Sequence, residues 1–274
     1  MSSPLRTVHG LVVSDGRAER EPETVLVEAP LAIQVAGDLV ATTMRTPGED
    51  RFLALGFLFA EGVVHALADV GSVYHCGRTD QPGYGDTIEV VPAPGVKLDV
   101  QRSRREGWTS SACGICGRAM IDDLRADLER PRAPTVPASL LRQVPRLLQL
   151  PLFAETGGAH GACAITRVGE VLAHAEDVGR HNAVDKVIGK LLYARRMPDP
   201  TREDAPILLA VSARAGFEIV QKAARAGFAC VATVSAPSSL AIDAAEAAGL
   251  TLASFVRDGR FTLYSHATRI EETR

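Results

Sequence analysis

The first hundred residues carry a pattern of short strands around one helix. Residues 1–24 are polar and mixed, and we expect them to be frayed or only lightly docked. Apolar side chains then recur with a period close to two, at Val25, Val27, Leu31, Ile33, Val35 and Leu39. Because Pro30 and Gly37-Asp38 interrupt this run, it predicts two or three short strands joined by hairpin turns.

One helix is predicted between these strands and the next pair. It begins near Asp50 and ends at Gly62, and residues 52–59 are apolar nearly all round. A helix without a polar face is usually buried. Further strands are predicted over Val70–His75 and Thr87–Val91, so residues 24–100 are expected to form an α+β unit.

The middle of the chain has no hydrophobic period. Residues 101–118 are charged and then rich in glycine and small side chains, which predicts an exposed loop. Residues 119–128 are helical in pattern, and residues 131–137 form a proline-rich linker.

Strands and helices alternate in the second half. A leucine-rich helical stretch at 140–148 is expected to be split by Pro145. Strands are predicted over 162–167, 171–176, 207–211, 228–234, 250–256 and 261–264, and helices over 182–193, 217–225 and 238–248. The last helix has Ser238 as its N-cap and Gly249 as its C-cap. This order predicts an α/β class, a three-layer domain with parallel strands.

The chain therefore divides into three predicted parts. Residues 1–118 form a smaller N-terminal α+β subdomain, residues 119–137 a helix and linker, and residues 138–274 the α/β sheet domain.

Composition narrows the class of protein. The chain has 274 residues, of which 46% are hydrophobic and 23% charged, so a mostly disordered chain is excluded. Its net charge of −3 excludes a dedicated nucleic-acid binder. No apolar run approaches the roughly 18 residues that span a bilayer, and residues 1–10 do not read as a secretory signal. We expect a cytoplasmic protein that binds neither nucleic acid nor membrane.

The sharpest chemical feature is Cys113-Gly-Ile-Cys116-Gly117. Two thiols three residues apart on a glycine-flanked loop, with several arginines nearby, favour a reactive thiolate that accepts and passes on sulfur as a persulfide. A redox pair, two unremarkable loop thiols, and a zinc site remain as alternatives. The zinc site would use Cys113, Cys116, His160 and Cys163. The other cysteines, Cys76, Cys163 and Cys230, sit in apolar sequence and are predicted to fill the core.

Polar residues lie at the ends of several predicted strands. One segment, Thr156–His160, precedes a strand, and four follow strands: Glu176–Asn182, Ser212–Arg214, Ser235–Ser239 and Arg257–Arg260. Ligands bind α/β sheets beyond the carboxyl ends of strands, and arginines with free helix N-termini hold phosphate there. The convergence favours a nucleotide or another phosphate-bearing ligand, although the phosphate loop and dinucleotide motifs are absent. No H-x-E precedes a C-x-x-C, so deaminase chemistry is disfavoured.

Together these segments resemble the FdhD family, the sulfur carrier proteins required for formate dehydrogenase activity. The resemblance spans roughly residues 24–265. It rests on Glu28–Ile33, Leu55–Phe57 with Glu61-Gly62, Cys113–Gly117, Thr156–His160, Glu176–Lys186, Phe217–Lys222 and Ser235–Ser239. One departure is Ser212-Ala-Arg-Ala-Gly216, where the family reads S-G-R-A-S. A glycine expected to need a positive φ is Ala213 here, and a hydroxyl is lost at Gly216.

The resemblance implies a reaction. A cysteine desulfurase would donate sulfur as a persulfide on Cys113, with Cys116 assisting, and the sulfur would pass to the bis-molybdopterin guanine dinucleotide cofactor of formate dehydrogenase. It also implies a homodimer with a cytidine deaminase-like fold that lacks the catalytic zinc, so no tightly bound metal is expected. The stretch that matches the family's cofactor-binding residues is Phe255, Val256, Arg257, Asp258, Gly259 and Arg260. Further contacts to the cofactor, or to guanine nucleotides such as GDP, are expected from His160, Arg180, His181, Ser212, Arg214 and Ser235.

Overall fold

A six-stranded mixed sheet forms the centre of the larger half of the molecule. The structure is a computed structural model, and it describes residues 3–77, 83–100 and 134–271. The sheet has the order β13-β12-β11-β10-β8-β9. Its strands are β8 (His160–Thr166), β9 (Val171–Asp177), β10 (Pro206–Val211), β11 (Cys230–Thr233), β12 (Thr251–Arg257) and β13 (Arg260–Ser265).

Only part of this sheet is parallel. Strands β10, β11 and β12 run parallel, whereas β8, β9 and β13 are antiparallel to their neighbours. The prediction of parallel strands therefore holds for three of the six. Strand β8 leads into β9 through the turn after Thr166, and β12 leads into β13 through Asp258-Gly259. Such tight turns can join only antiparallel strands.

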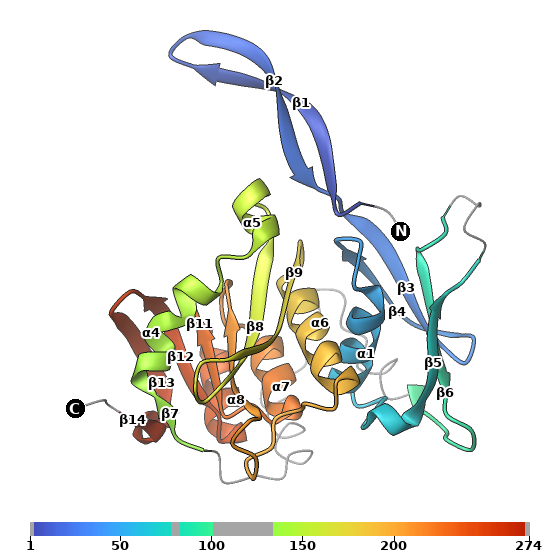
Figure 1. The fold of residues 1–274 in the computed structure, drawn as a ribbon, viewed down its shortest axis with the longest axis vertical. Coiled ribbons are helices and arrows are strands. Elements are labelled where there is room, and N and C mark those ends of the chain that lie inside the picture. The colour runs from blue at the N-terminus through green and yellow to red at the C-terminus, as the bar shows by residue number, and fades with distance from the viewer. Residues whose placement is uncertain (1–2, 78–82, 101–133, 272–274) are drawn as a thin grey trace.

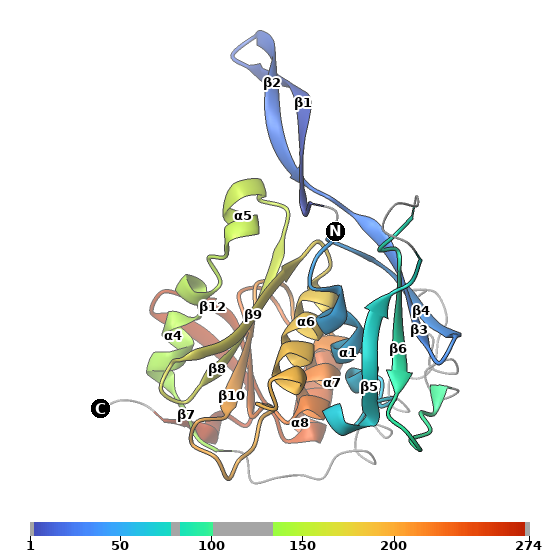
Figure 2. The same ribbon diagram turned by 45° about the vertical axis from the view of Figure 1, so that its right-hand side comes forward.

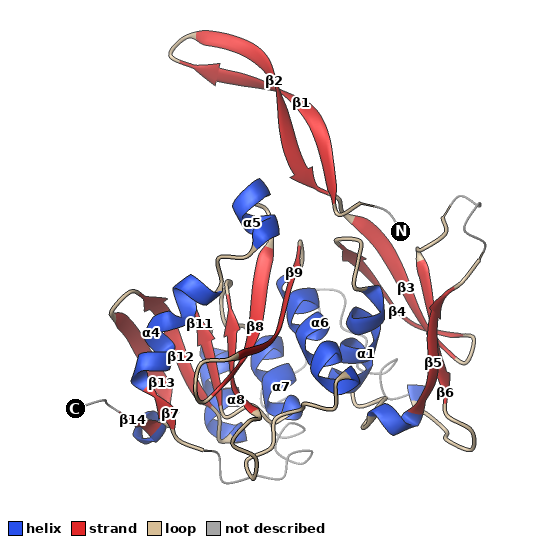
Figure 3. Cartoon of the chain, in the orientation of Figure 1, coloured by secondary structure: helices blue, strands red, loops and turns tan. Residues whose placement is uncertain are grey.

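Helices cover both faces of the sheet, as Figures 1 and 3 show. On one face lie α6 (Arg180–Tyr193), α7 (Phe217–Ala226) and α8 (Ser239–Ala248), packed on alternate strand residues such as Leu209 and Val231. On the other face, α4 (Ala138–Leu147) packs on Leu208, Cys230 and their neighbours. The expected three layers are present because each strand buries side chains in both directions.

A second sheet stands on the far side of the helices. It has the order β4-β3-β6-β5, built from β3 (Ala29–Val35), β4 (Asp38–Arg45), β5 (Val70–His75) and β6 (Thr87–Pro92). Helix α1 (Asp50–Ala60) lies between this sheet and α6 in both ribbon views (Figures 1 and 2). It buries Leu53, Leu55 and Leu58, as its apolar sequence predicts.

Helices α1 and α6 cross at two glycines. A Cβ built on Gly56 would lie 1.8 Å from the carbonyl oxygen of Asp185, and one on Gly189 would lie 1.9 Å from that of Phe52. The two helix backbones are therefore so close at this point that no side chain fits between them. The crossing joins the N-terminal unit to the sheet domain.

The polar N-terminus was predicted to be frayed or only lightly docked; it is not frayed, but most of its residues are exposed. Residues Leu5–Ser14 and Arg17–Leu26 form β1 and β2, a hairpin in continuous register that projects from the body (Figures 1 and 2). Asp15 and Gly16 at its tip have φ angles of 49° and 79°. Two positive φ angles match a type I′ hairpin turn, for which Asp-Gly is a strong signal.

One further expectation needs correction, and one helix was not predicted. Pro145 lies inside α4 and does not split it. Since Leu148 still donates to the carbonyl oxygen of Val144, the helix loses one bond near its end and continues. Helix α5 (Pro151–Thr156) was not anticipated. The predicted linker ends in β7 (Val136–Pro137), which pairs with β14 (Ile270–Glu271), and the short 3-10 turn η2 (Ala267–Arg269) directly precedes β14. A second such turn, η1 (Leu67–Asp69), directly precedes β5.

Among the described residues, no helix is long and apolar enough to cross a membrane. The likeness to cytidine deaminases and the three-part domain division stay predictions.

Candidate functional site

One edge of the six-stranded sheet gathers the polar segments. Strands β10, β11 and β12 end there, β8 and β13 begin there, and β9 ends beside the start of β8. The edge therefore holds His160, Asp177–His181, Ser212–Arg214, Ser235 and Arg257–Arg260. We call this set the strand-end edge. Three strand spacings separate β12 from β8, about 14 Å, so it suits an extended ligand.

Asp177 at the end of β9 is the structural hub of this edge. Its side chain is fully buried and accepts from the backbone N–H groups of Thr46 (3.1 Å) and Gly179 (2.8 Å) and from Asn182 Nδ2 (2.9 Å). Lys186 Nζ lies 2.7 Å from it and also donates to the carbonyl oxygens of Thr46 and Glu176. All of the ammonium donors of Lys186 are thus used inside the protein.

Other polar residues of the same string are also structural. Glu176 accepts from the N–H groups of Leu152 (2.8 Å) and Phe153 (2.7 Å) and so anchors the start of α5. Asp185 accepts two bonds from the buried Lys222 Nζ, at 2.8 and 3.0 Å. Paired, hydrogen-bonded charges can be buried, whereas isolated ones cannot.

His160, Arg180 and His181 form the half-buried, outward part of the edge. Burial, followed by the charge of Arg180, lowers the pKa of His160. Burial, followed by the charges of Arg180 and Lys222, lowers the pKa of His181 to about 3. Both rings are therefore neutral near pH 7. Within residues 3–77, 83–100 and 134–271, no hydrogen bond or ion pair engages the Arg180 guanidinium.

Glu218 was missed by the sequence analysis. It lies in the first turn of α7, half of its side chain is exposed, and its Oε2 is 3.1 Å from His181 Nδ1. The only sequence signal was an acidic residue soon after the predicted strand end at Val211.

Ser212 and Ser235 serve the local backbone. Ser212 Oγ accepts from the N–H of Gly161 at 2.8 Å, and the carbonyl oxygen of Ser235 accepts from the N–H of Phe255 at 3.2 Å. Arg214 is exposed. The expectation that position 213 needs a positive φ is wrong, since Ala213 has none and its methyl group is buried in the core.

The Phe255–Arg260 stretch contains a bulge. Phe255 has φ 53°, which is unusual for a bulky side chain, and is 39% exposed. Val256 next to it is fully buried and packs in the core beneath α4. Arg257 donates to the carbonyl oxygens of Val234 and Val256. The Arg260 side chain is exposed, and its guanidinium makes no hydrogen bond or ion pair with the described part of the chain. Strained, exposed residues of this kind gather at binding sites.

The zinc set is not brought together. His160 and Cys163 are three residues apart on one strand, so their side chains point to opposite faces of the sheet. Cys163 packs beneath α4 and donates to the carbonyl oxygen of Leu147. No group of three or more metal-ligating side chains occurs within the described ranges.

Cys113 and Cys116 lie outside the described residues. Of the other cysteines, Cys163 and Cys230 are fully buried as predicted, and Cys76 is half-buried. Burial raises the pKa of Cys163 to about 12 and also raises the pKa values of Cys76 and Cys230. These three thiols are therefore poor nucleophiles.

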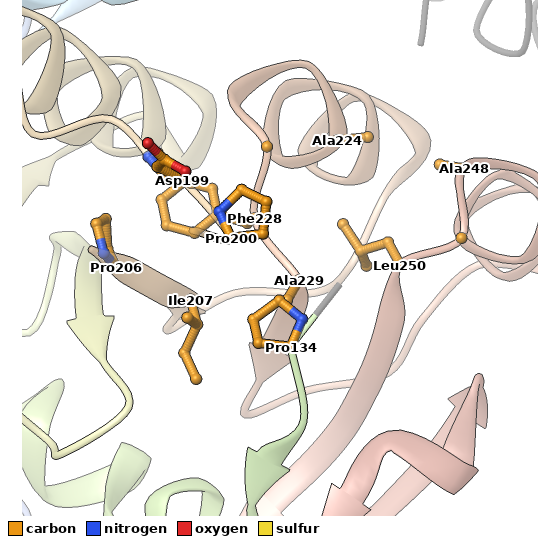
Figure 4. Close-up of a pocket in the computed structure, with 13 residues that line it drawn as sticks. Pro134, Asp199, Pro200, Pro206, Ile207, Ala224, Phe228, Ala229, Ala248 and Leu250 are labelled. Carbon is orange, nitrogen blue, oxygen red and sulfur yellow. The ribbon is translucent and has the colours of Figure 1, made fainter. Parts of the chain in front are cut away.

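A pocket lies at the opposite edge of the same sheet (Figure 4). It is lined mainly by proline, alanine and other apolar side chains near the starts of β10, β11 and β12, with Asp199 at its margin. It is remote from the strand-end edge.

The sequence model of the FdhD/NarQ family matches residues 26–271. The chain belongs to this family. FdhD/NarQ relatives named sulfur carrier protein FdhD cover nearly all of it. That of Anaeromyxobacter dehalogenans is 50% identical over 94% of this chain and 92% of its own. That of Streptomyces coelicolor is 40% identical over 94% and 93%.

A solved structure supports the fold of this FdhD/NarQ chain. It is a crystal structure described as a candidate formate dehydrogenase accessory protein from Desulfotalea psychrophila. The two superpose with a TM-score of 0.75 over 98% of this chain and 100% of the other, at 23% identity. This likeness shows the mixed α/β fold alone and assigns no site residues.

Proposed function

We propose that this protein is a sulfur carrier in the maturation of formate dehydrogenase. Relatives of 40–50% identity that match 94% of the chain bear the name sulfur carrier protein FdhD. The observation that carries the proposal is the state of the cysteines. Burial raises the pKa of Cys76, Cys163 and Cys230, so the Cys113-Gly-Ile-Cys116-Gly117 motif is left to supply the nucleophile.

The loading step is an exchange of sulfur between thiols. The Cys113 thiolate attacks the outer sulfur of a persulfide on a cysteine desulfurase, a persulfide forms on Cys113, and the donor leaves as its thiolate. Cys116 can assist release: attack of its thiolate on Cys113 Sγ forms a disulfide and frees the outer sulfur as sulfide. The disulfide is then reduced by a cellular thiol.

We propose that the recipient, bis-molybdopterin guanine dinucleotide, lies along the strand-end edge. Helices α6, α7 and α8 begin there, and the N–H groups at the starts of α6 and α7, which no side chain caps, favour phosphate. Arg180, Arg214 and Arg260 add guanidinium groups without a partner in the described chain. Arg260 suits a phosphate better than Arg257, which is bonded to two backbone carbonyl groups. We also propose that the protein forms a homodimer. Its client would be formate dehydrogenase.

The test is mass spectrometry after incubation with a desulfurase and cysteine. The parent should gain one sulfur atom, and Cys113→Ala should gain none. Cys116→Ala should load normally and release less sulfide. Cys76→Ala is the control, because Cys76 is a half-buried thiol of the same chain and should load like the parent.

Full loading of Cys113→Ala would contradict the assignment. Chelation of about one zinc per chain by Cys113 and Cys116, detected by elemental analysis, would favour a metal site on this loop instead.

A further inference from the structure

The β1–β2 hairpin is longer than its contacts with the rest of the protein explain. Ten residue pairs join β1 to β2 in continuous register. Among the described elements, its main contact is at the base, where α5 lies against β2, and the remainder stands clear of the packed layers (Figures 1 and 2). A two-stranded hairpin alone is only marginally stable in water, whereas a ribbon of three or more strands is stable. We therefore expect a further strand beside this hairpin.

The backbone of β1 has free hydrogen-bonding groups along its outer edge. The carbonyl oxygen of Pro4 accepts from the N–H of Val27 at 2.8 Å, so the Pro4 carbonyl points toward the β2 side. Successive residues of an antiparallel strand direct their N–H and C=O groups to alternate sides. The groups that point away from β2 are therefore those of Thr7, His9, Leu11 and Val13. Within the described residues, β1 pairs with β2 alone.

The two edges of the hairpin differ in their protection against pairing. Natural proteins protect open strand edges with proline, charged side chains or bulges. Strand β2 carries Pro22 opposite His9, at a position whose backbone points outward, and it also carries glutamates at positions 19, 21 and 23. Strand β1 has no proline, carboxylate or bulge, and its Leu11 and Val13 are 59% and 69% exposed. The β1 edge is therefore the one open to another strand.

We propose that β1 pairs with β1 of a second copy of this chain. A two-fold axis perpendicular to the hairpin makes two identical strands antiparallel, so the contact is closed and self-complementary. The resulting ribbon has the order β2-β1-β1-β2, and its two outer edges are the protected ones. Two paired ten-residue strands form about ten hydrogen bonds, as many as a typical protein interface contains. This inference rests on the homodimer proposed above and names its interface, and it does not depend on sulfur transfer.

The charges of the hairpin favour this arrangement. Leu11, Val13 and Ala18 lie on one face of the hairpin, and the three glutamates of β2 lie on the other. The two-fold axis keeps equivalent side chains on the same face, so the apolar residues of both protomers join. The two β2 strands would be three strand spacings apart, about 14 Å, which exceeds the screening length of about 8 Å. Pairing through β2 would instead bring the glutamates of both copies within about 5 Å.

The first test is sedimentation equilibrium of the full chain and two proline variants. Leu11→Pro removes an outward N–H from β1, and symmetry removes it twice, so the dimer dissociation constant should rise at least about tenfold. Arg20→Pro is the matched control. Arg20 lies directly opposite Leu11, and its N–H points outward from β2, so this variant should dimerise like the parent. Both variants should keep the main melting transition, because the hairpin stands clear of the layers.

The second test needs no substitution. Amide hydrogen exchange, followed by nuclear magnetic resonance on the dimeric parent, should be slow at the N–H groups of Thr7, His9, Leu11 and Val13. The N–H groups of Arg20 and Thr24, which have the same orientation on β2, should exchange fast.

Three results would overturn the inference. A parent that is monomeric at every concentration would overturn the homodimer as well, whereas sulfur loading of Cys113 would still be measured separately by mass. A dimeric parent with fast exchange along β1, and with Leu11→Pro as tightly dimeric as Arg20→Pro, would place the interface elsewhere and overturn this inference alone. Slow exchange along the outer edge of β1 in a monomeric parent would mean that a segment of the same chain covers it.

Discussion

At the residue scale, neighbouring polar positions of one string have opposite fates. Asp177 and Lys186 are fully used inside the protein, whereas Arg180 and His181 between them face the strand-end edge. Position along α6 explains the division. Residues 182–189 are all buried, whereas Arg180 and His181 form the start of the helix at the strand-end edge. The buried charges hold Thr46, and with it the N-terminal unit, against the sheet domain.

His181 should make stability depend on pH. Its pKa is about 3 in the folded chain, against an ordinary value of 6.5, so the unfolded chain binds more protons between these values. Stability is therefore full above about pH 6.5 and falls as the pH is lowered toward 3. His181→Asn should lose less unfolding free energy than the parent between pH 7 and pH 5 in urea titrations.

The control for this prediction is a substitution of a histidine outside the core. His9→Asn, on the exposed hairpin, should keep the slope of the parent. A residual slope in His181→Asn is expected because the pKa of His160 is lowered as well. An unchanged slope in His181→Asn would mean that His181 is not held neutral by its surroundings.

At the scale of elements, the contact of α1 with α6 joins two layers that are distant in sequence. The glycines at the crossing let the backbones approach until no side-chain atom fits between them. Leu55 and Leu58 of α1 and Val187 and Leu191 of α6 are fully buried around this crossing. Close packing of this kind cannot absorb an added methyl group without moving a helix.

Gly56→Ala should therefore be strongly destabilising. The new Cβ would meet backbone atoms of Asp185 at 1.8 Å, so α1 must shift away from α6. We expect a loss of at least about 2 kcal/mol in the free energy of unfolding, measured with urea. Gly10→Ala is the control, because its Cβ would meet only Glu23 Cγ at 3.6 Å, and it should change stability by less than about 0.5 kcal/mol. Equal stability of both variants would show that the helices can separate freely.

At the scale of the whole molecule, the β1–β2 hairpin stands apart from the packed layers (Figure 1). Leu11 and Val13 are 59% and 69% exposed, and nearly every residue of β2 before Thr24 is exposed. The family match also begins only at residue 26. An isolated two-stranded hairpin adds little to the stability of a domain.

Deletion of residues 1–24 should leave the rest of the protein folded. The main melting transition in calorimetry should stay within about 3 °C of the parent, because few buried apolar groups are removed. Deletion of residues 1–36 is the control. It removes Leu31, Ile33 and Val35 from the core of the second sheet and should abolish cooperative melting. Loss of the transition in the shorter truncation would show that the hairpin is needed for folding.

The sequence by itself determined the elements and much of their placement. Hydrophobic periods predicted α1, α6, α7, α8 and the strands between them, because burial leaves a repeat of 3.6 or 2. Side-chain chemistry identified the caps of α8, and Ser238 Oγ does accept from the N–H of Ala241. Because ligand-binding segments of α/β proteins follow strand ends, the sequence also predicted that these polar residues lie together at one edge of the sheet.

Only the tertiary structure decided which of those residues are free to bind. Asp177 and Arg180 are both charged residues of the same polar segment, and the sequence does not tell which of them is buried. In the structure, donors surround the Asp177 carboxylate, whereas the Arg180 guanidinium has no partner in the described chain. Strand alternation in a two-faced sheet separated His160 from Cys163. The fold also brought Glu218 to His181, across a separation of 37 residues that no local pattern records. A period reports what is buried, whereas a site depends on which elements meet.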